Sequence, residues 1–169
     1  SREAIEAASA EKAGHMVVWN QIHRWQYYGY RMRKTEMIYV VPTKSGVAGQ
    51  LLEGMLGGGH VDRHVLMTYH RVYLSKLAAL PDGDYRMDVP GSDELFYKEH
   101  MEFLSPFDVS GTKFVIERPL EHARGDQINS YLASERRVRR LSAKERSDSF
   151  MGTNYTLDDF EGFSGLVTD

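Results

Sequence analysis

The sequence has no cysteine among its 169 residues. The chain therefore forms no disulfide, holds no thiolate-bound metal and offers no cysteine nucleophile. It also lacks any run approaching the roughly 18 uninterrupted apolar residues of a membrane-spanning helix. These two absences lead us to expect a soluble domain.

A basic excess is missing as well, because 24 Asp and Glu residues outnumber 21 Lys and Arg residues and give a formal net charge of -3. Domains that bind nucleic acid usually carry a clear basic excess, so we expect no nucleic-acid partner. The chain also lacks a Gly-x-Ser-x-Gly elbow, a phosphate loop and a dinucleotide fingerprint. We therefore predict a protein that is not an enzyme and needs no cofactor.

The composition that remains is that of an ordinary globular domain. The hydrophobic share of 41% and the charged share of 27% are close to the globular average. A chain of this length can bury a sizeable core as one unit. We predict a single domain over residues 1–169, which is either a mature chain or an excised fragment of a longer one.

Patterns typical of β-strands dominate the chain. Aromatic and β-branched residues in the stretch 15–41 favour two strands with a break near Lys34, and residues 65–74 alternate with period two. Further strands are predicted at residues 85–89, 95–104, 113–117, 128–132 and 137–141. Helices are predicted at residues 1–13 and 47–56, a turn at residues 81–83, and a last helical turn at residues 156–160.

Most of these strands are joined by short segments that contain Pro, Gly, Asp or Ser. Such connections are typical of an antiparallel meander rather than of alternating strand and helix units. The predicted fold class is α+β and mainly β, with one curved antiparallel sheet and one or two helices packed against it. A sheet that curls can enclose a cavity, because inward and outward side chains alternate along every strand.

Three segments in the second half of the chain go beyond general composition. They read FLSPFDVSGT at residues 103–112, YLASERRVRRL at residues 131–141 and RSDSFMGTNYTLDDF at residues 146–160. In this order and spacing they resemble the bacterial outer-membrane lipoprotein-sorting type of protein, a LolA-like group that includes a related family of unknown function. Ala133 stands where the group commonly has proline, and Asn154 stands where it usually has aspartate.

The resemblance implies an incomplete β-barrel whose concave side is covered by helices and lined with apolar side chains. It also implies a periplasmic location, a lipid or acylated protein as partner, and an association with a membrane transporter of the resistance-nodulation-division type. From it we predict a binding or carrier protein for a lipid, an acylated protein or another hydrophobic ligand.

A carrier for an apolar ligand needs a dry concave surface, and aromatic and methionine side chains adapt to ligands of variable shape. The chain has ten Tyr and eight Met. The predicted ligand-binding residues are Trp19, Trp25, Tyr69, Tyr131, Phe150, Met151 and Tyr155. The alternative for each of them is an ordinary place in the core. Residues 147–159 form either a lid at the mouth of the cavity or a structural corner.

Four arginines surround Val138 after a predicted turn at Ala133 and Ser134. They are Arg136, Arg137, Arg139 and Arg140. Such a cluster can hold a phosphate or carboxylate headgroup, or a protein partner, by paired hydrogen bonds. The alternatives are a solvated hairpin balanced by nearby acids such as Glu135 and, against the acidic balance of the chain, contact with RNA.

The only arrangement in the sequence that resembles a metal site is formed by His60, Asp62 and His64. Zinc usually needs a third protein ligand, and none is indicated, so we predict no metal. Two further hypotheses remain open beside the carrier. One is a protein-interaction subunit that docks on a membrane complex and has no ligand cavity. The other is a small hydrolase or isomerase with a histidine and a carboxylate in one cavity.

Overall fold

The computed structural model describes residues 1–23, 28–42, 59–76, 85–121, 123–153, 155–162 and 165. Within these residues the dominant element is a sheet of six strands in the order β1-β2-β3-β4-β5-β6. The strands are β1 (Gly29–Pro42), β2 (Gly59–Tyr73), β3 (Leu95–Ser105), β4 (Lys113–Pro119), β5 (Gln127–Leu132) and β6 (Arg137–Leu141). Each strand pairs in antiparallel fashion with its neighbour in the sequence.

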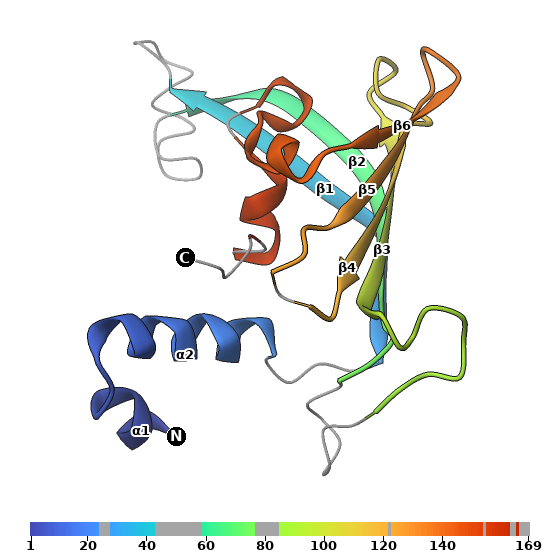
Figure 1. Ribbon diagram of the computed structural model, residues 1–169. Coiled ribbons are helices and arrows are strands. Elements are labelled where there is room, and N and C mark those ends of the chain that lie inside the picture. Colours follow the sequence, from blue (N-terminus) through green and yellow to red (C-terminus); the bar gives the residue numbers. More distant parts are fainter. Residues whose placement is uncertain are drawn as a thin grey trace.

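The sheet is curved and does not close, as Figure 1 shows. This confirms the predicted curved antiparallel sheet. The strands predicted from residue 95 onward and the strand at residues 65–74 each coincide with an observed strand. The helix predicted at residues 47–56 and the turn at residues 81–83 lie outside the described residues.

The N-terminal part corrects one prediction. Residues 15–22 are not a strand but the second half of helix α2 (Ala10–Ile22), which follows the short helix α1 (Arg2–Glu6). The helix begins at a cap, because the Ser9 side chain accepts a hydrogen bond from the Lys12 amide at 3.4 Å. Helix propensities differ by only a few tenths of a kcal/mol for most residues, roughly 0.7 kcal/mol at most. The capped start therefore outweighs the β-branched residues that follow.

Two further strand predictions differ from the structure. The break near Lys34 does not interrupt β1, which passes that point with only a shift of register between Met32 and Thr35. The strand predicted at residues 85–89 is reduced to an isolated bridge between Ser75 and Arg86, because the chain turns at residues 88–94 before β3 begins.

Alternate side chains of the strands point to the concave side and form the core. The C-terminal part of the chain adds three turns of 3-10 helix, η1 (Ala143–Ser147), η2 (Phe150–Gly152) and η3 (Leu157–Gly162). We call these three turns the C-terminal cover, because they lie inside the curve of the sheet (Figure 1). The predicted helical turn at residues 156–160 corresponds to η3.

Helix α2 lies at one end of the sheet and buries none of its residues. Its contact with the sheet is made at its C-terminal end, where Ile22 packs on a small aromatic cluster of Tyr73, Phe96 and Tyr97. The described helices lack the length and apolar character that crossing a membrane requires.

Candidate functional site

The concave face of the sheet carries the main apolar cluster of the protein. Inward side chains of the strands meet side chains from the C-terminal cover. The buried members are Val65, Met67, Tyr69, Met101, Phe103, Val109, Phe114, Ile116, Ile128, Phe150, Leu157 and Phe160. Aromatic, methionine and aliphatic groups thus line the concave face, and groups of these kinds predominate in the lining of ligand sites.

Aromatic rings join the cover to the sheet. The Phe160 ring stacks on the Tyr69 ring with 5.4 Å between centroids, and the Phe150 ring lies 5.4 Å from that of Phe114 and 5.8 Å from that of Phe103. Full burial of a phenylalanine side chain contributes about 1.5–3 kcal/mol. In this structure the protein's own side chains therefore occupy this part of the concave face.

A buried ion pair lies beside the apolar cluster. The Arg71 and Glu99 side chains are each 5% exposed and face each other from β2 and β3. The Arg71 Nε donates to Glu99 Oε1 at 2.7 Å, and the Tyr69 hydroxyl donates to the same oxygen at 2.8 Å. Burial and the Glu99 charge hold the pKa of the Tyr69 hydroxyl far above its usual range. Tyr69 is therefore a neutral donor at any ordinary pH.

A second buried group of charges ties the cover to the sheet. The Arg118 guanidinium from β4 forms an ion pair with the Asp126 carboxylate, at 2.5 Å (Nε to Oδ1) and 3.0 Å (Nη2 to Oδ2). From the cover, Arg146 also pairs with Asp126, and its Nε donates to Asp158 Oδ1 at 2.8 Å. Burial raises the pKa of Asp126, while the attraction of the two arginines opposes that rise.

The Tyr97 ring separates the two groups of charges. The Arg71 guanidinium carbon lies 4.4 Å from the ring centroid and that of Arg118 lies 5.6 Å from it, so both make cation–π contacts. Burial disfavours the charged form of Arg71, but Glu99 and the surrounding tyrosines more than offset this effect, and the pKa of Arg71 lies above its usual range. The arginines thus remain charged inside the protein.

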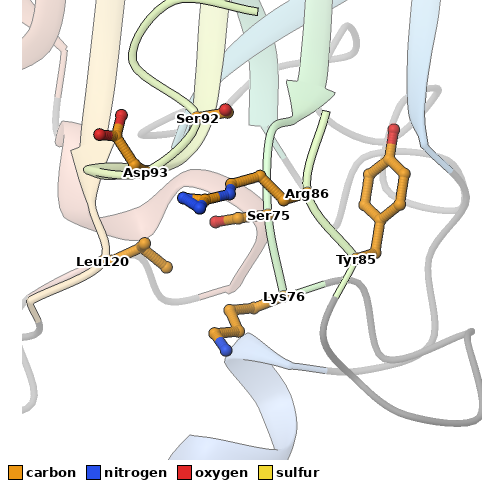
Figure 2. Close-up of a pocket in the computed structure, with 7 residues that line it drawn as sticks. All are labelled: Ser75, Lys76, Tyr85, Arg86, Ser92, Asp93 and Leu120. Atoms are coloured by element: carbon orange, nitrogen blue, oxygen red, sulfur yellow. The ribbon is translucent and has the colours of Figure 1, made fainter. Parts of the chain in front are cut away.

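A pocket of about 280 Å³ opens where β2 ends, β3 begins and β4 ends. It is lined by Ser75, Lys76, Tyr85, Arg86, Ser92, Asp93 and Leu120, which Figure 2 draws as sticks. Most of these side chains are polar, so the pocket differs in chemistry from the apolar cluster under the cover.

The predicted ligand-binding residues do not lie in one place. Tyr69 and Phe150 belong to the apolar cluster of the concave face, and Tyr155 packs against it. Trp19 is on α2, 49% exposed, with its ring against that of His23. Tyr131 lies on β5 opposite Val138, on the outer face of the sheet. Trp25 and the Met151 side chain lie outside the described residues. A role in ligand binding remains a prediction for each of them.

The predicted arginine cluster forms an exposed hairpin at the edge of the sheet. Arg136 sits in the turn with a φ of 51°, and the other three arginines belong to β6. Arg139 pairs with Glu135 at 2.5 Å, and Arg140 donates to the Gln127 side chain at 2.9 Å. Contact with a headgroup or a partner remains a prediction for this hairpin.

The sequence did not single out the buried charges Arg71, Glu99, Arg118, Asp126 and Arg146. One signal was present for Arg71, which falls in the same alternating phase as Val65, Met67 and Tyr69. A charge in the inward phase of a buried strand usually needs a partner. The partner itself is distant in the sequence, 28 residues away in the case of Glu99.

The candidate metal ligands His60, Asp62 and His64 lie on β2 rather than on a helix. His64 contacts the Glu36 carboxylate of the neighbouring strand at 3.3 Å. Within the described part of the chain, no three His, Cys, Asp or Glu side chains come close enough to hold a metal ion.

The unclosed, curved antiparallel sheet with turns packed on its concave face agrees with the fold class predicted from the sequence. The model of a family of proteins of unknown function, DUF1329, matches residues 9–169, and the chain belongs to this family. No curated protein is significantly similar to it.

Two crystal structures share the fold. One is a DUF1329 family protein from Desulfovibrio piger, with 18% identity and a TM-score of 0.56 over 90% of this chain and 49% of that chain. The other is a domain from Vibrio parahaemolyticus, provisionally assigned to outer membrane lipoprotein sorting, with 20% identity and a TM-score of 0.56 over 91% of this chain and 50% of that chain. The chain thus spans about half the length of each of these proteins.

Proposed function

We propose that the protein is a periplasmic binding or carrier module for a lipid, an acylated protein or another hydrophobic ligand, acting beside a membrane transporter. The observation that carries the proposal is the apolar concave face of an open sheet, closed by a short cover of 3-10 turns rather than by a second sheet. The fold shared with a domain provisionally assigned to lipoprotein sorting supports it.

In this proposal the C-terminal cover is the part that a ligand displaces. Short 3-10 turns have poorer hydrogen-bond geometry than an α-helix, and the cover contacts the sheet mainly through Phe150, Phe160 and the ion pair of Arg146 with Asp126. An acyl chain offers apolar contacts of the same kind as these rings. Ligand binding then exchanges one set of apolar contacts for another, which lowers the cost of displacing the rings. The buried Arg146 and Asp126 pair stays formed in this exchange, because breaking it would leave a buried charge without compensation.

Because the sequence has no cysteine, a single introduced cysteine can be labelled specifically. A Leu157→Cys variant carries its only thiol in the cover itself, on a side chain that packs into the apolar cluster and is 4% exposed in the parent residue. We expect the thiol to react slowly with a maleimide dye and to react faster when a fatty acid or lysophospholipid is added. A Val138→Cys variant is the matched control, because that position is 71% exposed and away from the cover. Its labelling should be fast and independent of lipid.

Native mass spectrometry of the purified protein, before and after addition of the same lipids, measures binding directly. A protein that carries no lipid and takes up none would contradict the proposal. Unchanged labelling of Leu157→Cys in the presence of bound lipid would contradict only the role of the cover.

A second candidate is a protein-interaction subunit with a filled core, since side chains of the cover occupy the concave face and the β6 hairpin exposes Val138 among its arginines. Capture of one stable membrane-protein partner, lost when the hairpin arginines are replaced by glutamine, together with no lipid uptake, would favour it. The hydrolase hypothesis gains no support from the described pocket, because no histidine lines it.

A further inference from the structure

The pocket at the end of the sheet is built by paired backbone rather than by loose loops. Ser75 and Arg86 form a β-bridge, and the Lys76 amide donates to the Tyr85 carbonyl at 2.8 Å. Lys76 adopts a φ of 54°, which is costly for a residue with a side chain. The bridge therefore holds the Lys76 and Arg86 side chains beside the same opening.

The lining of this pocket suits an anion. Among the described residues that line it, Lys76 and Arg86 bring two positive charges and Asp93 brings one negative charge. Figure 2 shows the Arg86 guanidinium lying between Ser75, Asp93 and Leu120. Within the described part of the chain, no hydrogen bond or ion pair engages this guanidinium. An arginine fork is the side chain best suited to two oxygens of one phosphate or carboxylate.

Two buried serines also line the pocket. Ser75 is 2% exposed and Ser92 is 7% exposed. The Ser75 hydroxyl donates to the Leu95 carbonyl at 2.8 Å, which fixes that side chain. The Ser92 hydroxyl has no hydrogen bond to any described residue, so it is available to donate to a ligand.

The lining of the pocket also includes apolar groups. Tyr85 and Leu120 line the pocket and also pack on the aromatic cluster of Tyr73, Phe96 and Tyr97. A volume of about 280 Å³ is at the lower limit of ligand pockets, which hold roughly 300–1,000 Å³. The space therefore fits a small charged group and not a whole lipid.

We propose that this pocket binds a phosphate group, with Arg86, Lys76 and the Ser92 hydroxyl as donors, and that it holds the headgroup of an anionic amphiphile whose apolar part lies along the aromatic cluster. The inference rests on the proposed carrier function for the source of the phosphate. The headgroup site in this proposal lies at the end of the sheet. The sequence had predicted it on the exposed β6 hairpin, where Arg139 and Arg140 already have partners.

Calorimetric titration at fixed ionic strength in a phosphate-free buffer tests the proposal. The probes are dihexanoyl phosphatidylglycerol, dihexanoyl phosphatidylcholine, monodecanoyl glycerol and inorganic phosphate. We expect the anionic lipid to bind at least about tenfold more tightly than the other two lipids, because charged hydrogen bonds are worth that much or more. Arg86→Gln and Lys76→Gly should remove this preference.

Two variants serve as matched controls. Arg137→Gln removes an exposed arginine of the hairpin, and Arg136→Gly replaces a second described non-glycine residue with positive φ, at 51°. Both should keep the preference for the anionic lipid. Glycine adopts a φ of 54° without strain, so Lys76→Gly should keep the fold, and circular dichroism checks this. If that variant unfolds, Arg86→Gln decides alone.

The possible outcomes separate the pocket from the carrier function. Equal binding of all three lipids to every protein would overturn the pocket and leave the carrier function in place. Binding of inorganic phosphate that both pocket variants abolish, without binding of any lipid, would support the phosphate site and overturn the carrier function. If neither lipid nor phosphate binds, both proposals are wrong.

Discussion

Arg146 of the C-terminal cover and Asp126, which precedes β5, form an ion pair in which the side chains are only 5% and 1% exposed. Asp126 is also held by Arg118 of β4. One carboxylate therefore joins the cover to the sheet. A buried pair of this kind is costly to break, because the partner left behind is a charge without compensation.

Replacing Asp126 should be more harmful than replacing Arg146. Asp126→Ala leaves two buried arginines without their shared carboxylate and should lower the free energy of unfolding by about 3–5 kcal/mol. Arg146→Ala should cost less, because Arg118 still neutralises Asp126. Urea denaturation measures both. Arg139→Ala, which breaks the exposed pair with Glu135, is the control and should change stability by no more than about 1 kcal/mol. Equal losses in all three variants would contradict the assignment.

The Arg71 and Glu99 pair should behave as one unit. Arg71→Met and Glu99→Leu alone should each destabilise the fold by about 3–5 kcal/mol, because each leaves one buried charge. The double variant should lose clearly less than the sum, since both charges are then gone. A double-mutant cycle by chemical denaturation gives the coupling. Additive losses would show that the Arg71 and Glu99 side chains are not energetically coupled.

Two glycines should respond in opposite ways to alanine. A Cβ atom on Gly29 would lie 2.3 Å from the Arg71 carbonyl oxygen, so β1 and β2 would have to separate. We expect a loss of about 1–3 kcal/mol, as for other overpacked sites. Gly14 lies inside α2 with no atom within 4 Å of the added Cβ. Gly14→Ala should be neutral or stabilising by about 0.5–1 kcal/mol. Thermal unfolding of the two variants makes the comparison.

His70 on the outer face of the sheet should titrate below the usual histidine value of about 6.5. Burial lowers its pKa, as do Arg31 and His100, while Glu102 acts in the opposite direction. The Arg31 Nε donates to His70 Nε2 at 3.0 Å, which requires a free lone pair on that nitrogen. The unfolded chain therefore binds a proton more readily than the folded one, and stability should fall as the pH drops below about 6.5.

The measurement for His70 is an NMR titration of the imidazole ring. Arg31→Gln should raise the midpoint toward the usual value, because it removes both the charge and the donor. His70→Gln should flatten this part of the dependence of stability on pH. A wild-type midpoint at or above the usual value would contradict the hydrogen bond seen in the structure.

Much of the sheet could be predicted from the sequence, because period-two alternation is a local signal. The predicted strand at residues 137–141 has the observed bounds of β6. The second half of helix α2 was missed because it contains Val17, Val18 and Trp19, and composition alone placed these residues in a strand. The decisive feature, the Ser9 cap, comes before that stretch.

The positions of the candidate residues could be predicted less well than the fold, for a physical reason. Tyr131 was predicted to bind a ligand because it is aromatic. Ile128 and Ser130 take the inward phase of β5, so Tyr131 lies on the outer face, and its role stays a prediction. The phase is set by Ile128 and by pairing with β6, where the Ser130 hydroxyl donates to the Arg139 carbonyl at 3.3 Å. Ion pairs such as Arg146 with Asp126 are set by tertiary structure, which alternation cannot reveal.

The sequential order of the strands has a consequence for biosynthesis. Each strand can dock on the one made just before it, so the sheet can assemble while the chain is still being synthesised. The rings of Phe150 and Phe160 arrive last. Until then the apolar side chains of the concave face stay exposed to water, and transiently exposed surface of this kind favours aggregation.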